Sequence, residues 1–401
     1  MKPAPLKHSR RAWGSSDDNA LMSSRRFVVI GAGILGASVA ARLAAAGLRV
    51  TLLDQDRPGH ATSRWSFAWI NANDKGPRPY HDLNHAGIRA WAELAPDLDG
   101  PAWYRPSGHV ELAGSRAELE ARVQRLTDWG YPARLASPAE AAALEPALRV
   151  PPDAAAAFFP DEGYLLTEPL ITRLVAHAES HGAEVRTGEA GRVTGLDSSP
   201  DASPRVRTAA GAVLEADEVI CCAGRWTPDL AAVPLVPWRS RGSAAPELVV
   251  RVGPVAPTGP VRLVHTADLA MRPHPGGLLH LEAEDAGAAV DLHTPDPELR
   301  RWGDELLHRA RRTVRGLDDA RVVELKVCAR PLPVDGVSVV GRFPGAQGIY
   351  VAVTHSGVTL AAHLSRLITA DLTTGTPPAE LIPYTPARFT PGAPRTRSPN
   401  Q

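Results

Sequence analysis

Residues 31–36 form the pattern in this sequence whose chemistry is easiest to state. Gly31-Ala32-Gly33-Ile34-Leu35-Gly36 has the spacing G-x-G-x-x-G. In that spacing Gly31 allows a tight turn, Gly33 leaves room for a pyrophosphate, and Gly36 lets the following helix pack closely on a strand. The first N–H groups of a helix from Ile34 to Ala46 would then face the pyrophosphate with a partial positive charge. A glycine-rich turn that binds no nucleotide has the same pattern.

The residues around this turn favour a dinucleotide. Phe27–Ile30 is a short apolar strand before it, Gly47 ends the helix after it, and Val50–Leu53 is a second strand. Asp54 follows that strand, where a carboxylate accepts hydrogen bonds from a ribose diol and repels a 2′-phosphate. The order strand, turn, helix, strand and acid therefore predicts a Rossmann-type unit that binds FAD or NAD rather than NADP.

The rest of the chain contains further strands and helices. A helix is predicted over 167–181, with Thr167 as its N-cap and Gly182 after its end. Ser137-Pro138-Ala139-Glu140 is a capping box at the start of a short helix, and 296–315 is an amphipathic helix. The remaining predictions are short strands at 183–186, 192–196 and 218–222, and a hairpin within 263–284 that turns at His274-Pro275-Gly276-Gly277.

These elements predict an α/β fold with two domains. Strand–turn–helix segments lie at 25–80, 150–235 and 325–375, and we assign them to the Rossmann-type domain. Residues 81–149 and 236–324 are assigned to a second, α+β substrate domain, inserted in two pieces and built on an antiparallel or mixed sheet. Residues 1–24 are predicted to be a disordered tail, in which Met22 is a second candidate start, and 376–401 a proline-rich tail or surface strap.

Composition excludes several classes of function. The 401 residues carry 44 basic and 44 acidic side chains, so the chain lacks the basic surface that nucleic acid or anionic lipid requires. The three cysteines, of which Cys221 and Cys222 are adjacent, provide no disulfide framework or zinc spacing and favour the cytoplasm. No apolar run approaches the roughly 18 residues of a membrane span. Polar residues follow Ser9-Arg10-Arg11, so no export signal is expected there, and no metal ion is expected.

Five later segments carry small, hydroxyl and glycine residues in a recognisable order. They are Gly59-His60-Ala61-Thr62-Ser63-Arg64, Gly163-Tyr164-Leu165, Glu218–Trp226 with its Ala223-Gly224 pair, Arg330-Pro331 followed by Asp335-Gly336 and Gly341, and Thr354–Leu360. Together with the glycine turn, these segments resemble the D-amino-acid oxidase family of FAD-dependent oxidoreductases, which includes glycine oxidase, sarcosine oxidase and D-amino acid dehydrogenases. The resemblance extends from Phe27 to Asp371.

The resemblance implies a glutathione-reductase-like FAD-binding domain. Its last helix, whose apolar face includes Val358, Leu360 and Leu364, would direct its first N–H groups at the flavin N1–C2=O edge, where negative charge collects on reduction. An ordinary core helix with a glycine start would have the same sequence. The residues implied to contact FAD are Gly31, Gly33, Ile34, Leu35, Gly36, Asp54, Thr62, Ser63, Val193, Ala223, Gly224, Gly341, Gly357, Val358 and Thr359.

Arg330 and His355 are the candidate catalytic residues. In glycine oxidase-like members the arginine of the Arg-Pro pair binds the substrate carboxylate, a task that suits a guanidinium because it donates two parallel hydrogen bonds. A structural salt bridge is the alternative for Arg330. His355 would contact the substrate or accept a proton, although the family more often has a small hydroxyl residue here. A surface or loop-capping histidine is the alternative. Phe67, Trp69 and Asn71 would line the flavin face or fill the domain boundary.

A cysteine and the lysines bear on the flavin chemistry. Cys328 stands seven residues before Asp335, as the flavin-linked cysteine of sarcosine oxidases does, but Arg330 replaces the aromatic residue found there. We therefore expect non-covalent FAD, with a bond to Cys328 as the alternative. Sarcosine oxidase-like members also place a lysine of the inserted domain over the flavin to promote reaction with O₂. No lysine lies between Lys75 and Lys326, which favours slow reaction with O₂ and another electron acceptor.

The function implied is oxidation of the C–N bond of a small amine or amino acid. The substrate would pass a hydride to flavin N5, the imine would hydrolyse, and O₂ or another acceptor would reoxidise the flavin. Three alternatives stay open. They are an aromatic hydroxylase or halogenase, an NAD-dependent dehydrogenase, and a flavin-binding subunit without catalytic activity. Gly341-Arg342 counts against the first, because those enzymes usually have Gly-Asp there.

Overall fold

A mostly parallel sheet of six strands contains the glycine turn. The computed structural model describes residues 24–199, 202–237 and 240–390. The strand order is β19-β20-β13-β1-β2-β9, and only β19 runs antiparallel to its neighbour. Strands covered on both faces are typically runs of Val, Ile and Leu, as these are. Their bounds are β1 Arg26–Ile30, β2 Arg49–Leu53, β9 Glu184–Arg186, β13 Glu218–Cys221, β19 Val339–Arg342 and β20 Ile349–Val353.

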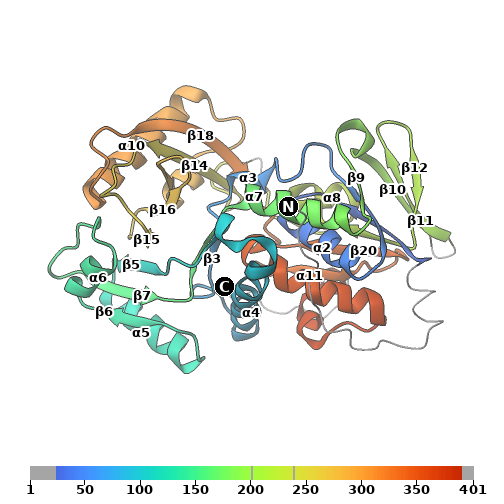
Figure 1. The fold of residues 1–401 in the computed structure, drawn as a ribbon, viewed down its shortest axis with the longest axis horizontal. Coiled ribbons are helices and arrows are strands. Elements are labelled where there is room, and N and C mark those ends of the chain that lie inside the picture. The colour runs from blue at the N-terminus through green and yellow to red at the C-terminus, as the bar shows by residue number, and fades with distance from the viewer. Residues whose placement is uncertain (1–23, 200–201, 238–239, 391–401) are drawn as a thin grey trace.

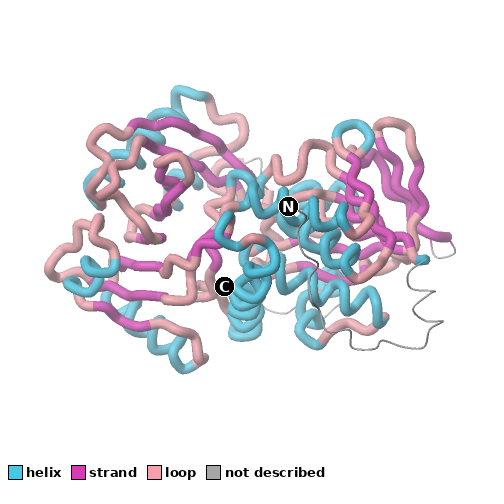
Figure 2. Tube along the Cα trace, in the orientation of Figure 1, coloured by secondary structure: helices cyan, strands magenta, loops and turns pink. Residues whose placement is uncertain are grey.

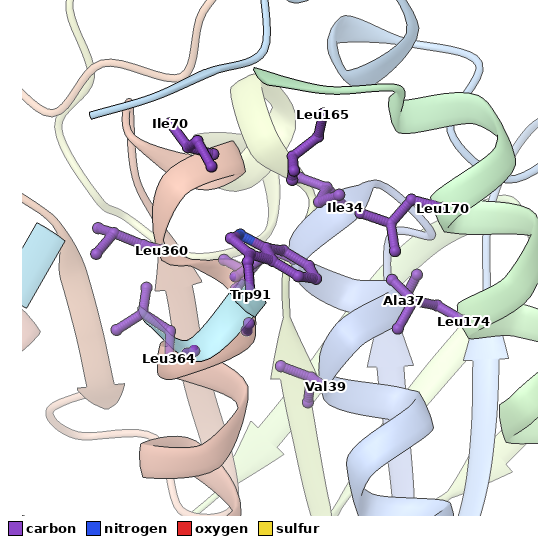
Figure 3. Packing of buried hydrophobic residues seen from close by; sticks show 14 of the residues in the cluster. Ile34, Ala37, Val39, Ile70, Trp91, Leu165, Leu170, Leu174, Leu360 and Leu364 are labelled. Carbon is purple, nitrogen blue, oxygen red and sulfur yellow. The ribbon is translucent and has the colours of Figure 1, made fainter. Parts of the chain in front are cut away.

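Four helices enclose the core beside this sheet. Helix α2 (Ile34–Ala45) packs against α7 (Thr167–Ser180) and α11 (Gly357–Thr374), and α11 also packs against α4 (Arg78–Leu94). The indole of Trp91 is fully buried between α2 and α11, as Figure 3 shows. Seven of the twelve residues of α2 are Ala, Val or Gly, and such small side chains let neighbouring helices approach closely.

A second sheet of eight strands lies on the other side of the molecule (Figures 1 and 2). Its order is β18-β14-β17-β16-β15-β5-β7-β6, and every pairing is antiparallel except that of β5 with β15. That parallel pair joins strands from two distant parts of the sequence. The bounds are β5 His109–Ala113, β6 Arg134–Ala136, β7 Ala155–Phe159, β14 Pro246–Gly253, β15 Leu263–His265, β16 Ala270–His274, β17 Leu278–Glu282 and β18 Arg321–Ala329.

Helices pack against both ends of the second sheet. α5 (Arg116–Asp128) and α6 (Pro138–Leu144) pack against β6 and β7, whereas α9 (Glu284–Ala289) and α10 (Asp296–Thr313) pack against β14, β17 and β18. The predicted capping box of Ser137 and Glu140 is present, with both reciprocal hydrogen bonds. The amphipathic helix and the hairpin around 274–277 are also confirmed.

Two small sheets and several short helices complete the fold. β3 (Trp69–Ile70), β8 (Gly163–Leu165) and β4 (Tyr104–Arg105) form one small sheet near the junction of the two large ones. β10 (Val193–Ser199), β11 (Ala202–Thr208) and β12 (Val213–Glu215) form the other, at the right of Figure 1. The short helices are α3 Thr62–Trp65, α8 Thr227–Leu230, η1 Ala95–Leu98, η2 Gly100–Ala102, η3 Gly188–Ala190, η4 Gly224–Trp226, η5 Ala379–Tyr384 and η6 Pro386–Phe389.

The sequence predictions agree with this fold except at particular residues. The fold class, a Rossmann-type domain with an α+β domain on a mixed sheet, is confirmed. Thr167 is not the N-cap of α7 but its first helical residue, because its hydroxyl donates to the carbonyl of Ser63 instead of accepting from the helix. Within the described residues, no helix is long and apolar enough to cross a membrane.

The domain boundaries stay a prediction, but two of them pass close to strands. The boundary at residue 150 puts β7 with the Rossmann-type segments, whereas β7 pairs with β5 and β6 in the eight-stranded sheet. The boundary at 325 divides β18, which pairs along its length with β14. The predicted N-terminal tail lies almost entirely outside the described residues, as do 391–401. Residues 379–389 contain η5 and η6, which pack against β19 and which we call the C-terminal strap; its Leu381 and Tyr384 are buried.

Candidate active site

A cavity of about 2250 Å³ lies between the six-stranded and eight-stranded sheets. On one side it is lined by the loops that follow the carboxyl ends of β1, β2, β13 and β20. On the other side it is lined by residues of β14, β15, β17 and β18. Open α/β sheets bind ligands at the carboxyl ends of their strands, so this is the expected place for a dinucleotide.

The glycine turn is shaped by close backbone contacts. Gly31 has φ +100°, and a Cβ atom on it would lie 2.5 Å from the carbonyl oxygen of Cys222. A Cβ atom on Gly36 would lie 1.8 Å from the carbonyl oxygen of Gly31. No side chain fits at either position without moving the backbone. At Gly33 only the hydroxyl oxygen of Ser63 lies near, at 3.2 Å, so this glycine keeps open space in front of α2.

Polar groups surround the start of α2. The hydroxyl of Ser63 accepts a hydrogen bond of 3.0 Å from the N–H of Ile34. Asp54 accepts from the N–H groups of Ala32, at 2.6 Å, and of Asp56, at 2.9 Å, and burial raises the pKa of its carboxyl group. These bonds fix the carboxylate beside the turn. Because a carboxylate has about four acceptor sites, Asp54 can still accept hydrogen bonds from a ribose diol.

The first turn of α11 approaches the same place from the other side. The side chain of Ile34 is the nearest group to a Cβ atom built on Gly357, at 3.8 Å, so the two helix starts adjoin. The hydroxyl of Thr359 donates to the carbonyl of Trp69 at 3.3 Å, and the N–H of Asn71 donates to that hydroxyl at 3.4 Å. The cavity therefore has a helix N-terminus at two points, each of which favours negative charge.

Arg330 and His355 lie together where the two sheets meet. Nη1 of Arg330 donates to Nε2 of His355 at 3.3 Å. The same nitrogen is 3.4 Å from a carboxylate oxygen of Glu247, and Nη2 donates to the carbonyl of Ala244 at 2.6 Å. Burial, followed by the charges of Arg330 and Lys75, lowers the pKa of His355 well below its ordinary value. The imidazole is therefore neutral and the guanidinium is the cation of the pair.

These features match a known group of flavoproteins. The family model described as DAO, FAD dependent oxidoreductase, matches residues 26–371. The chain belongs to this family. It is an enzyme, and its cofactor is FAD. The family covers both large sheets, so the whole cavity lies within the matched residues.

Several known proteins resemble the chain along most of its length. The uncharacterized oxidoreductase YurR of Bacillus subtilis is 26% identical over 402 residues, covering 90% of this chain and 99% of the relative. The solved structure of glycine oxidase from Geobacillus kaustophilus has a TM-score of 0.76 at 22% identity and covers 92% and 100% of the two chains. Iminodiacetate oxidase from Chelativorans sp. BNC1 has a TM-score of 0.74 at 25% identity and covers 90% and 99%.

Most of the residues proposed for FAD line the cavity. They are Gly31, Gly33, Ile34, Leu35, Asp54, Thr62, Ser63, Val193, Ala223, Gly224, Gly357, Val358 and Thr359. Gly36 lies behind the turn, against Gly31. Gly341 does not line the cavity, because a Cβ atom on it would meet Pro386 at 3.1 Å, so this glycine makes room for the C-terminal strap. Phe67, Trp69 and Asn71 do line the cavity.

The thiol of Cys328 reaches the cavity but is poorly suited to a covalent bond. Burial, followed by the charges of Glu247 and Glu282, raises the pKa of this thiol well above its usual value. A protonated thiol is not the nucleophile that flavin attachment requires. This favours the non-covalent FAD expected from the sequence over a bond to Cys328. Cys221 and Cys222 are buried and free, as expected for small residues in a core strand.

Sequence reasoning missed the charged residues that the eight-stranded sheet brings to the cavity. Glu247 and Glu282 both line it, and burial, followed by the charge of Glu247, raises the pKa of Glu282 well above its usual value. The carboxyl group of Glu282 therefore favours its protonated form, near the charges of Glu247 and Arg330. The only available signal was a glutamate at the end of the apolar strand Leu278–Glu282. Lys75 also lines the cavity, although its position in the sequence indicated only the domain junction.

Proposed function

We propose that this member of the DAO family oxidises the C–N bond of a small amine or amino acid and releases an imine that water hydrolyses. The supporting observation is the cavity whose lining includes the glycine turn, the start of α11, and the pair formed by Arg330, after β18, and His355, after β20. A cofactor site and a substrate site for a small charged molecule would thus share one cavity. Glycine oxidase and iminodiacetate oxidase, to which the chain is similar, act on molecules of this size.

The residues that hold FAD in this proposal differ in their contribution. The turn at Gly33 and the first N–H groups of α2 receive the pyrophosphate, and Asp54 accepts hydrogen bonds from the ribose. Thr62 and Ser63 lie beside them on α3, which Thr62 ties to β18 by donating to the carbonyl of Ala329 at 2.8 Å. When bound, FAD supplies the chemistry, because it accepts a hydride from the carbon next to the substrate nitrogen.

Arg330 is proposed to bind a substrate carboxylate in competition with Glu247. Its guanidinium is charged, and Glu247 is the main cause of its raised pKa. Its Nε is buried without a hydrogen-bond partner, so the protein does not use all of its donors. A substrate carboxylate would take over the charge-assisted hydrogen bonds, while neutral His355 keeps Nη1 in place. A purely structural ion pair with Glu247 is the competing role.

An anaerobic substrate screen tests the proposal. Purified holoenzyme is mixed without oxygen with glycine, iminodiacetate, other secondary amines, and D- and L-amino acids, and the flavin absorbance is followed. Bleaching by at least one amine is expected. Bleaching by NADH alone, or by none of these compounds, would contradict the proposed reaction, and the second result would favour a flavin-binding subunit without catalytic activity. The electron acceptor and the cytoplasmic location stay predictions.

A further inference from the structure

A fully buried carboxylate stands behind the cavity wall. Glu162 has no exposed surface, and four donors from three parts of the chain are directed at its two oxygens. Oε1 accepts from the hydroxyl of Tyr131 at 2.6 Å. Oε2 accepts from the indole N–H of Trp69 at 2.8 Å and the amide of Asn73 at 3.1 Å, and it lies 3.0 Å from Nδ1 of His109. So many donors fit an ionised carboxylate.

Two histidines connect this carboxylate to the cavity. Nε2 of His109, on β5, lies 2.9 Å from Nδ1 of His265, on β15. His109 is fully buried, whereas His265 lines the cavity. The connection depends on the parallel pairing of β5 with β15, the pair that joins the two distant parts of the eight-stranded sheet. Figure 1 shows these two strands side by side near β3.

The hydrogen-bond chain determines which nitrogen carries each proton. The carboxylate of Glu162 accepts, so Nδ1 of His109 donates to it. Nε2 of a neutral His109 is then an acceptor, and Nδ1 of His265 donates to it. The second nitrogen of His265, Nε2, is left with a lone pair, and His265 is the member of the chain that lines the cavity. A histidine oriented in this way by a buried carboxylate is suited to accept a proton.

His265 also lies close to the proposed flavin site. Its ring centroid is 4.3 Å from that of Trp69. The carbonyl of Trp69 in turn accepts from Thr359, in the first turn of α11. His265 and the first turn of α11 therefore both contact Trp69, and both line the cavity in which the proposed oxidation of an amine would occur.

We propose that His265, His109 and Glu162 form a proton relay that deprotonates the substrate ammonium. Nε2 of His265 takes a proton from the ammonium, and the Nδ1 proton of His265 moves to Nε2 of His109. The products are a neutral amine, a neutral His265 and a His109 imidazolium paired with the Glu162 carboxylate. These steps are proton transfers in which nothing is oxidised or reduced. They leave the amine in the neutral form that can give up a hydride. The relay rests on the proposed function, because it requires an amine substrate.

The surroundings explain why two histidines are needed. Burial, followed by His109 and Arg122, lowers the pKa of His265 well below its ordinary value, so His265 does not keep a proton. The next ring in the chain, His109, has the carboxyl group of Glu162 at 3.0 Å from its Nδ1. Burial, followed by Glu162, raises the pKa of Tyr131 well above its usual value, so that hydroxyl remains a donor to the carboxylate.

Other charged groups near His265 are partly compensated. Glu111 is its neighbour across the β5–β15 pair and forms an ion pair with Arg122. The ring of Phe67 contacts both His265 and His280. His280 is buried and forms a hydrogen bond with Arg272. Among these groups, only His109 and Glu162 form a hydrogen-bonded path that starts at His265.

The pH dependence of flavin reduction tests the relay. The rate of reduction is measured by anaerobic stopped flow with an amine identified in the screen, for the wild type and His265→Gln. At pH 7 the variant should be slower by roughly 10- to 100-fold, and its rate should rise about tenfold per pH unit up to the pKa of the free amine, near 8–10. Rescue at high pH is expected because solution then removes the proton. His109→Gln should show a smaller loss of the same kind.

His280→Gln is the matched control. His280 is a fully buried histidine on the same sheet, but it is not part of the cavity lining. This variant should retain the wild-type pH profile. If His265→Gln loses the same fraction of activity at every pH, or loses none, the relay is wrong. A loss at every pH would indicate a packing role for His265 instead.

A second measurement does not depend on turnover. In ¹⁵N-histidine-labelled holoenzyme, the signals of His265 are identified by their absence in His265→Gln. Two-bond couplings should show a neutral ring protonated on Nδ1. Protonation on Nε2 instead would contradict the relay. If no amine reduces the flavin, the proposed function fails, whereas the state of this ring still decides whether the hydrogen-bond chain has the proposed direction.

Discussion

A side chain added at Gly33 should prevent FAD binding and leave the fold intact. Only the hydroxyl of Ser63 lies near the position of its missing Cβ, so Gly33→Val should fold like the apoprotein. Its side chain would occupy the space in front of α2 that the pyrophosphate needs. We expect colourless protein with an unchanged circular dichroism spectrum. Purified Gly33→Val that keeps a full complement of FAD would show that the site is elsewhere.

Asp54 should contribute less to cofactor binding than Gly33. Asp54→Ala removes one acceptor of ribose hydrogen bonds and leaves the glycine turn in place. The expected weakening is on the order of 1.5–3 kcal/mol, typical of hydrogen bonds to a charged group. Titration of apoprotein with FAD, followed by flavin fluorescence, measures it. An affinity equal to that of the wild type would remove Asp54 from the proposed site.

Arg330 and Glu247 form a pair whose two substitutions should have opposite effects. Arg330→Ala should raise KM for a carboxylate substrate by an amount equivalent to about 2–5 kcal/mol, with FAD retained. Arg330→Lys should restore part of the loss, since lysine keeps the positive charge but cannot donate two parallel hydrogen bonds to a carboxylate. Glu247→Gln should lower KM, because the competing carboxylate is gone. An unchanged KM in Arg330→Ala would favour the structural ion pair.

At the scale of elements, the strap formed by η5 and η6 is predicted to stabilise the six-stranded sheet. Leu381 is 2% exposed, whereas the adjacent Ile382 is 61% exposed. Leu381→Ala should therefore lower the free energy of unfolding by about 2–5 kcal/mol. Ile382→Ala is the matched control and should change it by less than about 0.5 kcal/mol. Equal midpoints of denaturant unfolding for the two variants would show that the strap is not part of the cooperative fold.

At the scale of the whole molecule, FAD should be held by shape and hydrogen bonds alone. Acid or heat precipitation of the yellow protein should leave FAD in the supernatant. The physical reason is the buried, protonated thiol of Cys328, which is a poor nucleophile. Cys328→Ala should keep its flavin. Flavin that stays in the acid pellet of the wild type, and is lost from it in Cys328→Ala, would establish the covalent alternative.

Reaction with oxygen depends on charges that different parts of the fold bring to one cavity. The sequence favours slow reoxidation, because no lysine lies between Lys75 and Lys326. Lys75 nevertheless lines the cavity and helps to lower the pKa of His355, so a cation is present. We expect Lys75→Met to slow reoxidation of the reduced enzyme in air-saturated buffer by about tenfold or more, since a nearby cation stabilises superoxide.

The anaerobic reduction rate of Lys75→Met is the control and should change little. Hydrogen peroxide should form at the rate of reoxidation. If the wild type and the variant are reoxidised equally slowly, Lys75 has no role with O₂, and the enzyme passes its electrons to another acceptor, as the sequence favours.

The sequence by itself determined the local features of this protein. The order of strand, glycine turn, helix and acid is contiguous, so residues 26–54 predicted a dinucleotide site without knowledge of the rest. The same holds for the capping box at Ser137 and the hairpin at 274–277, because turns and caps depend on neighbouring residues. The ordered family motifs then identified FAD and the Arg330–His355 region.

Tertiary structure decided everything that depends on pairing across long stretches of sequence. His109 and His265 are 156 residues apart, and they meet because β5 pairs with β15. Glu247 reaches Arg330 because β14 pairs with β18, and Gly341 faces the strap and not the cavity because of where the C-terminal residues pack. Strand pairing between distant segments is set by the burial of whole sheet faces. A local pattern therefore does not reveal which buried charges will share a site.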